Sequence, residues 1–525
     1  MPKALSPSQG DFHRSLRLLS PLLRSFNRNL RLLSPHALRA FTRSSAANMT
    51  TLKEKTVKGV IWSSIDRFST QGISFVFSML IARMLLPSDY GVIAMLGIFM
   101  AVSQCFIDSG FGAALIRKKD RTETDFCTVF YFNIVVSCLF YGLLWLASPY
   151  IARFYDMPLL ESVTKVWGLN LIVNAFGGIQ NAQLSIAIDF KSRAKISVIT
   201  TLFTGAIGLW LAYRGYGVWA LVYQGVASAI LRCILLWCIV RWVPKLIFSW
   251  KSFRELFSFG SKLLASSLLD TVYNNIYTLV IGKFFSASSL GVYSRASHLA
   301  QFPSSNITGV LQNVTFPVLS TIQDEEERLA NAYRRFLRLS AFVVFPLMLG
   351  LSAVADPFIR LTLTDKWEGS IYLLQIICFA LMWYPIHAIN LNLLQVKGRS
   401  DYFLKLEIIK KVMGVCILCI TIPLGLVAMC YGRIVGSLFA LVINTYYTKK
   451  IIGYGFLKQM RDLTHILIHA LVMYALVWLV VQCLPGLWLQ LIVGILVGMA
   501  YYLLGAYLMK FDELNELLAL IKRKK

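Results

Sequence analysis

Apolar runs separated by short polar segments fill the sequence from about residue 57 onward. Most runs contain about 20 residues, which is the length that an α-helix needs to cross the hydrocarbon core of a bilayer. The pattern therefore predicts about 14 membrane-spanning helices, with about 12 as the alternative count. We expect the spans near 57–80, 90–107, 126–147, 162–184, 196–213, 217–240, 260–282, 290–320, 336–356, 369–394, 403–424, 427–447, 463–484 and 486–509.

One hairpin of two apolar runs, residues 55–120, recurs in the second half of the chain. The residues around its turn have counterparts 200 positions later, so that Ile81, Arg83, Ser88, Gly91 and Val92 correspond to Ile281, Lys283, Ser288, Gly291 and Val292. Because six expected helices separate the two copies, both enter the membrane in the same direction, and the repeat is parallel. We expect an N-lobe at 49–242 and a C-lobe at 260–450, followed by two further helices and a basic tail at 451–525.

The segment between the lobes, 243–259, has an amphipathic pattern. It places Trp250, Phe253 and Phe257 on one helical face and its basic residues elsewhere. This pattern is typical of a helix that lies in the membrane interface. We expect it to tether the two lobes on the cytoplasmic side.

Residues 1–48 differ from the rest of the chain. They are rich in arginine and serine, contain Asp11 as their one acid, and have apolar stretches that are interrupted by Pro21 and Pro35. These interruptions exclude the apolar core of a secretory signal. The composition is similar to that of an organellar transit peptide, whereas the sequence from Met49 is typical of the start of a bacterial membrane protein. We interpret the segment as a start-site artefact or a disordered basic tail.

Composition supports a membrane protein, and the positions of the basic residues indicate its orientation. Of the 525 residues 57% are apolar and only 15% are charged, and the mean hydropathy is +0.63, which excludes a soluble globular protein. The formal charge of +26 comes largely from basic clusters between the apolar runs, such as 117–121 and 449–461. Such clusters set orientation, so we expect no nucleic-acid partner. Because they lie in alternate loops, we expect a multi-pass protein of the bacterial inner membrane with both termini in the cytoplasm.

Short motifs carry a resemblance to a known family. The chain resembles the polysaccharide exporters (Wzx-type, colanic-acid-exporter-like) of the multidrug/oligosaccharidyl-lipid/polysaccharide flippase superfamily in the elements Ala82-Arg83, Pro87-Ser-Asp-Tyr-Gly91, Asp108-Ser-Gly-Phe-Gly-Ala-Ala-Leu-Ile-Arg117 and Leu290-Gly-Val-Tyr-Ser-Arg-Ala296. The resemblance implies two six-helix lobes around a central cavity, alternating access, and a lipid-linked oligosaccharide as cargo. In one departure, the second hairpin has Ser286-Ala-Ser-Ser-Leu290 in place of the Pro-Ser-Asp-Tyr element, so the lobes are not interchangeable.

Two polar stripes lie within the expected spans. Their members follow one another at four-residue spacing on one helix face, with Asp66, Thr70 and Ser74 on the first helix and Asp270, Asn274 and Thr278 on the seventh. Polar groups are costly inside a bilayer, so both stripes are expected to face the same cavity. Asp66 has an alternative role, since it can pair with Arg67 or a neighbouring helix for packing. Asp270 has no basic neighbour within a turn, which favours the cavity.

A lipid-linked sugar carries its charge on a phosphate or diphosphate, so a cavity that moves it needs fixed cations. We expect Arg67 and Arg295, one in each lobe, to bind this phosphate. Other basic residues within spans are further candidates, although lysines near the end of a span extend to the lipid headgroups: Lys165, Arg232, Lys410, Lys411 and Arg433. We expect Glu407 to pair with Lys411 as a structural salt bridge. The candidates for ion coupling are Asp66, Asp270 and Glu407.

These features favour a transporter that moves a polyprenyl-diphosphate-linked oligosaccharide from the cytoplasmic to the outer leaflet, for lipopolysaccharide O-antigen or exopolysaccharide synthesis. Its expected partners are this lipid, membrane lipids and other polysaccharide-assembly proteins. We expect no catalytic residues, no metal and no cofactor, since the ten cysteines are scattered singly and no glycine-rich phosphate loop is present.

Two alternatives remain open. A cation-coupled multidrug exporter of the same fold would have an acid-lined, less basic cavity. A membrane-embedded glycan polymerase or ligase would carry a large outward loop with catalytic groups. The outward segments of this chain are short, and the longest lie near 148–158 and 356–368.

Overall fold

The computed structural model describes residues 69–522 of the chain. Within this range every regular element is a helix, and nine helical segments are long and apolar enough to cross a membrane. The protein is therefore an all-α, multi-pass membrane protein. The number of about 14 spans stays a prediction, because several other long helices of the described part are too polar for composition alone to identify them as spans. The expected presequence, 1–48, lies outside the described residues.

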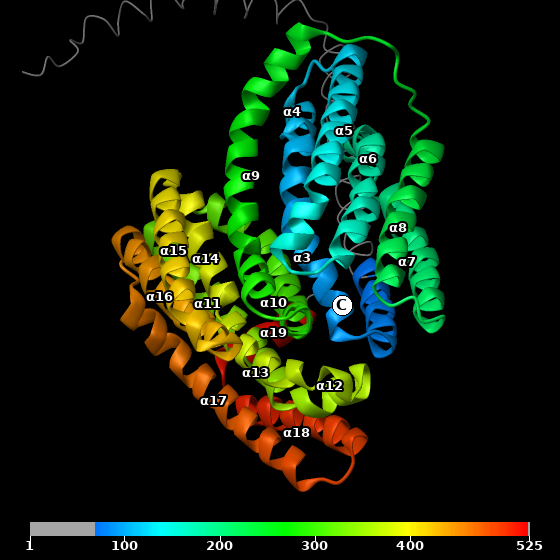
Figure 1. The fold of residues 1–525 in the computed structure, drawn as a ribbon. Helices are drawn as coiled ribbons and strands as arrows, with labels where there is room; N and C mark the ends of the chain where they lie inside the picture. The colour runs from blue at the N-terminus through cyan, green and yellow to red at the C-terminus, as the bar shows by residue number, and fades with distance from the viewer. Residues whose placement is uncertain (1–68, 523–525) are drawn as a thin grey trace, which may run out of the picture.

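The N-lobe consists of a helix at 69–84 and the helices that follow it (Figure 1): α3 (Pro87–Asp108), α4 (Phe111–Arg117), α5 (Glu123–Phe154), α6 (Leu159–Ile186), α7 (Phe190–Tyr213) and α8 (Val218–Val240). Local sequence fixes where these helices begin. α3 has Pro87 in its first turn, and the Asp89 carboxylate accepts a 2.9 Å hydrogen bond from the backbone N–H of Leu86. The side chains of Thr122 and Asp189 cap the N-termini of α5 and α7.

The C-lobe contains α9 (Trp250–Phe284), α10 (Ala287–Thr321), α11 (Glu326–Ala353), α12 (Ala355–Leu363), α13 (Gly369–Leu381), α14 (Tyr384–Val396), α15 (Ser400–Thr421) and α16 (Leu426–Ile452). Two short 3-10 turns, Asp365–Trp367 and Ile422–Leu424, lie between its helices. The expected span 369–394 is divided into α13 and α14, with Pro385 in the first turn of α14. By contrast, α10 continues through Pro303 and Pro317 without a break.

The segment between the lobes is only partly helical. Residues 243–249 are not helical, whereas α9 begins at Trp250 and continues through the expected span 260–282 as a single 35-residue helix. The first turns of α9 pack against the N-lobe, since Phe253 and Phe257 contact the ring of Phe111 in α4. Residues 250–259 and the first membrane helix of the C-lobe therefore form one continuous helix.

Three further helices follow the C-lobe: α17 (Phe456–Cys483), α18 (Leu487–Leu508) and α19 (Asp512–Lys522). α17 packs against α11, and α18 packs against α12 and α17, on the side of the C-lobe away from the N-lobe (Figure 1). Ion pairs hold α19 to α11. Arg338 pairs with Glu513 at 2.5 Å and with Asp512 at 3.2 Å, and Arg335 pairs with Glu516 at 2.7 Å. The Glu513 side chain is 2% exposed.

The two lobes meet where α3 and α10 begin, and the contact is reciprocal. A Cβ atom built on Gly91 of α3 would lie 1.8 Å from the carbonyl oxygen of Ala287, and one built on Gly291 of α10 would lie 1.8 Å from that of Pro87. The two glycines are counterparts in the repeat, 200 positions apart. Because neither has a side chain, the two helix starts touch backbone to backbone.

A cation from each lobe flanks this glycine contact. Arg83 donates a 3.2 Å hydrogen bond to the backbone carbonyl of Leu361 in the C-lobe. Lys283, its counterpart in the repeat, donates a 2.5 Å hydrogen bond to the backbone carbonyl of Phe154 in the N-lobe. Both carbonyls lie in the last turn of a helix, where free carbonyl groups and the helix dipole attract cations.

An aromatic residue of the opposite lobe completes each side of the contact. The buried Trp367 donates a 2.8 Å hydrogen bond to the carbonyl of Ala82. Tyr155 packs against Gly282, which is the counterpart of Ala82 in the repeat. These matching contacts close the space between the lobes at one end, which is the end of α9 opposite to the connecting segment 243–249.

Candidate functional site

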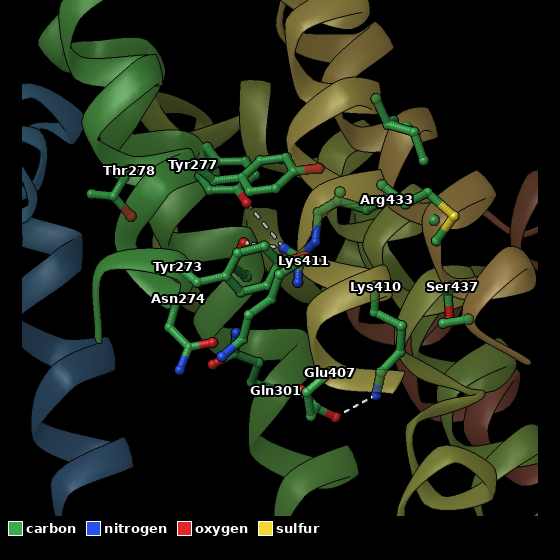
Figure 2. Close-up of a pocket in the computed structure, with 18 of the residues that line it drawn as sticks. Tyr273, Asn274, Tyr277, Thr278, Gln301, Glu407, Lys410, Lys411, Arg433 and Ser437 are labelled. Atoms are coloured by element: carbon green, nitrogen blue, oxygen red, sulfur yellow. Dashed lines mark hydrogen bonds and ion pairs between the residues drawn. The ribbon is translucent and has the colours of Figure 1, made fainter. Parts of the chain in front are cut away.

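A cavity of about 500 Å³ lies within the C-lobe between α9, α10, α15 and α16, and we call it the C-lobe cavity. In Figure 2 the aromatic side chains of α9 face the cations of α15 and α16, namely Tyr273, Tyr277, Lys410, Lys411 and Arg433. Gly414 of α15 leaves room for the hydroxyl group of Tyr273. The cavity therefore combines aromatic rings with several positive charges.

Arg433 is held in this cavity by neutral partners. Its guanidinium donates to the hydroxyl groups of Tyr293 at 3.0 Å and Ser297 at 3.4 Å, and it lies 5.7 Å from the centre of the Tyr277 ring. Among the described residues no carboxylate pairs with Arg433. A guanidinium has five N–H donors, so several remain for a bound anion.

The two lysines of the cavity have acidic partners. Lys410 donates to Glu407 at 2.5 Å, and Lys411 forms an ion pair with Asp270 of α9. The expected pairing of Glu407 with Lys411 is therefore wrong, because Lys411 points toward α9 whereas Lys410 extends along its own helix. The interpretation of Asp270 as a carboxylate without a basic neighbour also needs correction, since its partner comes from a helix that is distant in sequence.

Three of the other expected site residues lie at the C-lobe cavity, and two lie outside the described residues. Asn274 and Glu407 line the C-lobe cavity, and Asp270 adjoins it through Lys411. Asp66 and Arg67 lie outside the described residues, so their expected roles stay predictions.

Arg295 lines neither the C-lobe cavity nor the N-lobe cavity that is described in the next paragraph. Its guanidinium crosses from α10 to the helix at 69–84, where it donates to the hydroxyl of Ser78 at 2.7 Å and to the backbone carbonyl of Ser78 at 3.0 Å. The residue is 5% exposed, and its guanidinium lies near the rings of Tyr90 and Trp367. In this arrangement Arg295 joins the two lobes, and its expected binding of phosphate stays a prediction.

A second cavity of about 490 Å³ lies in the N-lobe, between the helix at 69–84 and α3, α6, α7 and α8; we call it the N-lobe cavity. Its polar lining consists of amides, hydroxyls and the imidazole of His298, and its aromatic lining includes Trp167 and Tyr90. No lysine, arginine, aspartate or glutamate among the described residues lines it. His298 of α10 lines both this cavity and the C-lobe cavity, so the two adjoin.

An apolar groove of about 720 Å³ lies beside the N-lobe cavity, mainly between α10, α11, α17 and α18. Its lining is almost entirely hydrocarbon and aromatic, and it shares Phe75 and Phe302 with the N-lobe cavity. A charged cavity, a polar cavity without lysine, arginine or acids in its described lining, and an apolar groove are thus adjacent.

Sequence reasoning did not identify several of the lining residues. Lys410 and Lys411 were candidate cations for which extension to the lipid headgroups was the favoured alternative, but both line the C-lobe cavity. Tyr273 and Tyr277 follow the same four-residue spacing as the Asp270 stripe, which is a signal that could have placed them beside it. Arg433 was one candidate among several, and only its place in the cavity lining and its hydrogen bonds to Tyr293 and Ser297 of α10 distinguish it.

The sequence is similar to a known protein family and to several of its relatives. Residues 80–372 match the family model described as "Polysaccharide biosynthesis protein". The chain is 26% identical over 355 residues to the teichuronic acid biosynthesis protein TuaB of Bacillus subtilis (strain 168), which covers 67% of this chain and 74% of that protein. It is 25% identical over 401 residues to the lipopolysaccharide biosynthesis protein WzxC of Escherichia coli (strain K12), which covers 75% of this chain and 80% of that protein.

A solved structure with the same fold is the lipid II flippase MurJ in its inward closed conformation. Its TM-score to this chain is 0.70 at 16% sequence identity, and the match covers 86% of this chain and 99% of that chain. The likeness shows that the two chains share their arrangement of helices.

Proposed function

The chain belongs to the polysaccharide biosynthesis protein family, and from that membership we propose that it is a flippase for a lipid-linked oligosaccharide. It moves a polyprenyl-diphosphate-linked oligosaccharide from the cytoplasmic to the outer leaflet, for the synthesis of a surface polysaccharide. The names of TuaB and WzxC, which concern teichuronic acid and lipopolysaccharide biosynthesis, support this assignment. So does the fold that the chain shares with a protein named as a lipid II flippase.

The observation that carries the proposal is the charge of the C-lobe cavity. Its described lining contains three cations and one carboxylate, Glu407, and Arg433 has no carboxylate partner among the described residues. A cation among membrane helices is costly, so its presence there indicates a functional site. A diphosphate is a suitable ligand, because guanidinium and ammonium groups both form charge-assisted hydrogen bonds with phosphate oxygens. Arg67 and Arg295 stay further candidates for phosphate binding.

The alternative of a multidrug exporter is less well supported. Such a protein takes up cations and would therefore carry an excess of acids in its cavity, whereas the C-lobe cavity carries an excess of bases. The alternative of a glycan polymerase also has little support in the described residues. The acids of the segment 356–368 are all paired with Arg360, which contacts Asp356, Asp365 and Glu368 at 2.9, 2.7 and 2.9 Å.

The proposed setting is the bacterial inner membrane, with both termini in the cytoplasm. The distribution of basic residues over alternate loops supports this orientation. It places the connecting segment 243–249 on the cytoplasmic side, and the reciprocal contact of α3 and α10 at the outer side. Candidate partners are the lipid-linked oligosaccharide, membrane lipids and other proteins of polysaccharide assembly.

The experiment that tests the proposal measures cargo in a strain that lacks the protein. Lipid-linked glycan should accumulate on the cytoplasmic leaflet, where a glycosidase added to inside-out vesicles can digest it. The chain carrying Arg433→Ala should restore export poorly, with an apparent affinity that is lower by roughly ten- to a hundredfold, because a charge-assisted contact contributes about 1.5 to 3 kcal/mol. Arg433→Lys, which keeps the charge, should restore part of the export.

Arg328→Ala is the matched control, since Arg328 is exposed and pairs only with Glu325 of the same segment, at 3.2 Å. Export and protein abundance are measured together for each variant. The proposal fails if no glycan accumulates in the deletion strain. The role of Arg433 fails separately if its Ala and Lys variants export equally well at equal abundance.

A further inference from the structure

The N-lobe cavity has the chemistry of a carbohydrate site. Apart from the imidazole of His298, its described polar groups are neutral, with amides from Gln71 and Gln224 and hydroxyls from Thr201, Thr204 and Ser228. Amides and hydroxyls both donate and accept hydrogen bonds, as sugar hydroxyls do. A cavity that binds a phosphate would need a cation instead.

Three glycines leave room for side chains that line the cavity or lie beside it. A Cβ atom on Gly225 would collide with the indole ring of Trp167, one on Gly208 with the amide of Gln224, and one on Gly205 with the ring of Phe77. Each glycine therefore leaves room for one larger side chain of the lining, because the helices are closely packed. The large indole of Trp167 lines the cavity in this way and offers an apolar surface to a sugar ring.

One polar atom of the lining lacks a partner among the residues that the structure describes. The Oε1 atom of Gln71 is buried and makes no hydrogen bond with the described part of the chain. A buried acceptor without a partner costs free energy. A rotation of the Gln71 side chain toward the N-lobe cavity would let a bound hydroxyl group donate to this atom.

The two cavities differ at matching positions of the two lobes. α8 and α16 both begin at a capping glycine, Gly217 and Gly425. Counted from these caps, Gly225 of the N-lobe corresponds to Arg433 of the C-lobe. Where the C-lobe has a cation for an anion, the N-lobe thus has a glycine that makes room for the aromatic face of Trp167.

We propose that the N-lobe cavity binds the glycan of the cargo while the C-lobe cavity binds its phosphate groups. The proposal rests on the function proposed above and deepens it by assigning each part of the cargo to a lobe. His298 lines both cavities and marks their junction, so a glycan that continues from a phosphate held by Arg433 enters the N-lobe cavity there.

The test compares two probes on the purified full-length protein in nanodiscs. One probe is polyprenyl diphosphate without sugar, and the other is polyprenyl diphosphate that carries the repeat oligosaccharide, extracted from the producing strain. Dissociation constants are measured by native mass spectrometry for the wild type, Gln224→Leu, Thr201→Val and Arg433→Ala.

We expect Gln224→Leu to weaken the binding of the glycan probe by roughly three- to tenfold and to leave the binding of the sugar-free probe unchanged. Thr201→Val, which keeps the shape of the side chain, should act in the same direction with a smaller effect. Thr464→Val is the matched control, because Thr464 is exposed on α17 and bonds only to the carbonyl of Met460. Arg433→Ala should weaken both probes equally.

The assignment is overturned if Gln224→Leu and Thr201→Val weaken both probes alike, or neither. It is also overturned if the wild type binds the glycan probe no more tightly than the sugar-free probe. Failure of the proposed function looks different, since the wild type would then bind neither probe. Melting temperatures recorded on the same samples distinguish a lost contact from a misfolded variant.

Discussion

The reciprocal glycine contact between the lobes leads to a sharp prediction for alternating access. An ordinary contact of a Cβ atom is 3.4 Å or longer, whereas a Cβ on Gly91 would lie 1.8 Å from the carbonyl oxygen of Ala287. In Gly91→Ala the starts of α3 and α10 must therefore move apart by roughly 1.5 Å, because neither backbone can yield alone in a close-packed contact. Overpacking of this kind costs about 1 to 3 kcal/mol. The closed arrangement should lose population by about five- to 150-fold.

The assay uses a cysteine inside the C-lobe cavity, Ser294→Cys, in a chain without its native cysteines. An impermeant thiol reagent added from outside should label it faster in Gly91→Ala than in the parent chain. Gly291→Ala should have a similar effect, because the contact is reciprocal and a Cβ there meets Pro87 in the same way.

Gly97→Ala is the matched control for this experiment. Gly97 lies on the same helix as Gly91, and a Cβ atom on it would meet nothing within 4 Å. It therefore reports any effect of adding a methyl group to α3 without a clash. Labelling at the control rate in both Gly91→Ala and Gly291→Ala would show that this contact does not control access to the cavity.

Three further predictions concern other parts of the molecule. Cysteines placed at Ser88 and Ser288 should both react with the impermeant reagent from outside, because the repeat is parallel; reaction of only one would refute that orientation. Arg338→Ala should lower the melting temperature in detergent, because it leaves the buried carboxylate of Glu513 without its partner at 2.5 Å, at a cost of about 1 to 3 kcal/mol; Glu513→Gln should be milder, and equal melting temperatures would contradict this. Arg295→Ala should reduce protein stability more than cargo affinity, since its hydrogen bonds join the lobes; a loss of affinity at unchanged stability would instead support phosphate binding.

The architecture was predictable because its signal is strong and local. Apolar runs long enough to cross a bilayer leave few alternatives to a helical membrane protein. The match between Gly91 and Gly291 is likewise visible in the sequence, and it marks two positions that contact each other's helices. The break between α13 and α14 was not predicted, because the apolar pattern passes through it unchanged.

The candidate site was less predictable, because its pairings join residues that are distant in sequence. Lys411 is four positions from Glu407, which favoured a pairing along the helix, but α9 brings Asp270 closer to it. Arg433 and Arg295 both stand in long stretches without another charged residue. Only the tertiary contacts separate them, since Arg433 faces a cavity and Arg295 bonds to Ser78 of the other lobe.

Positions that match between the two lobes and positions that differ have separate functions in this fold. Positions that match between the lobes, such as Arg83 with Lys283, make matching contacts across the interface. When the two lobes rock against each other, these matching contacts must break and form again together, which requires that the lobes be similar at the interface. Positions that differ, such as Gly225 and Arg433, line the cavities. A cargo with a charged end and a neutral end needs this asymmetry, so exchanging Gly225 and Arg433 should abolish export without reopening the contact of α3 with α10.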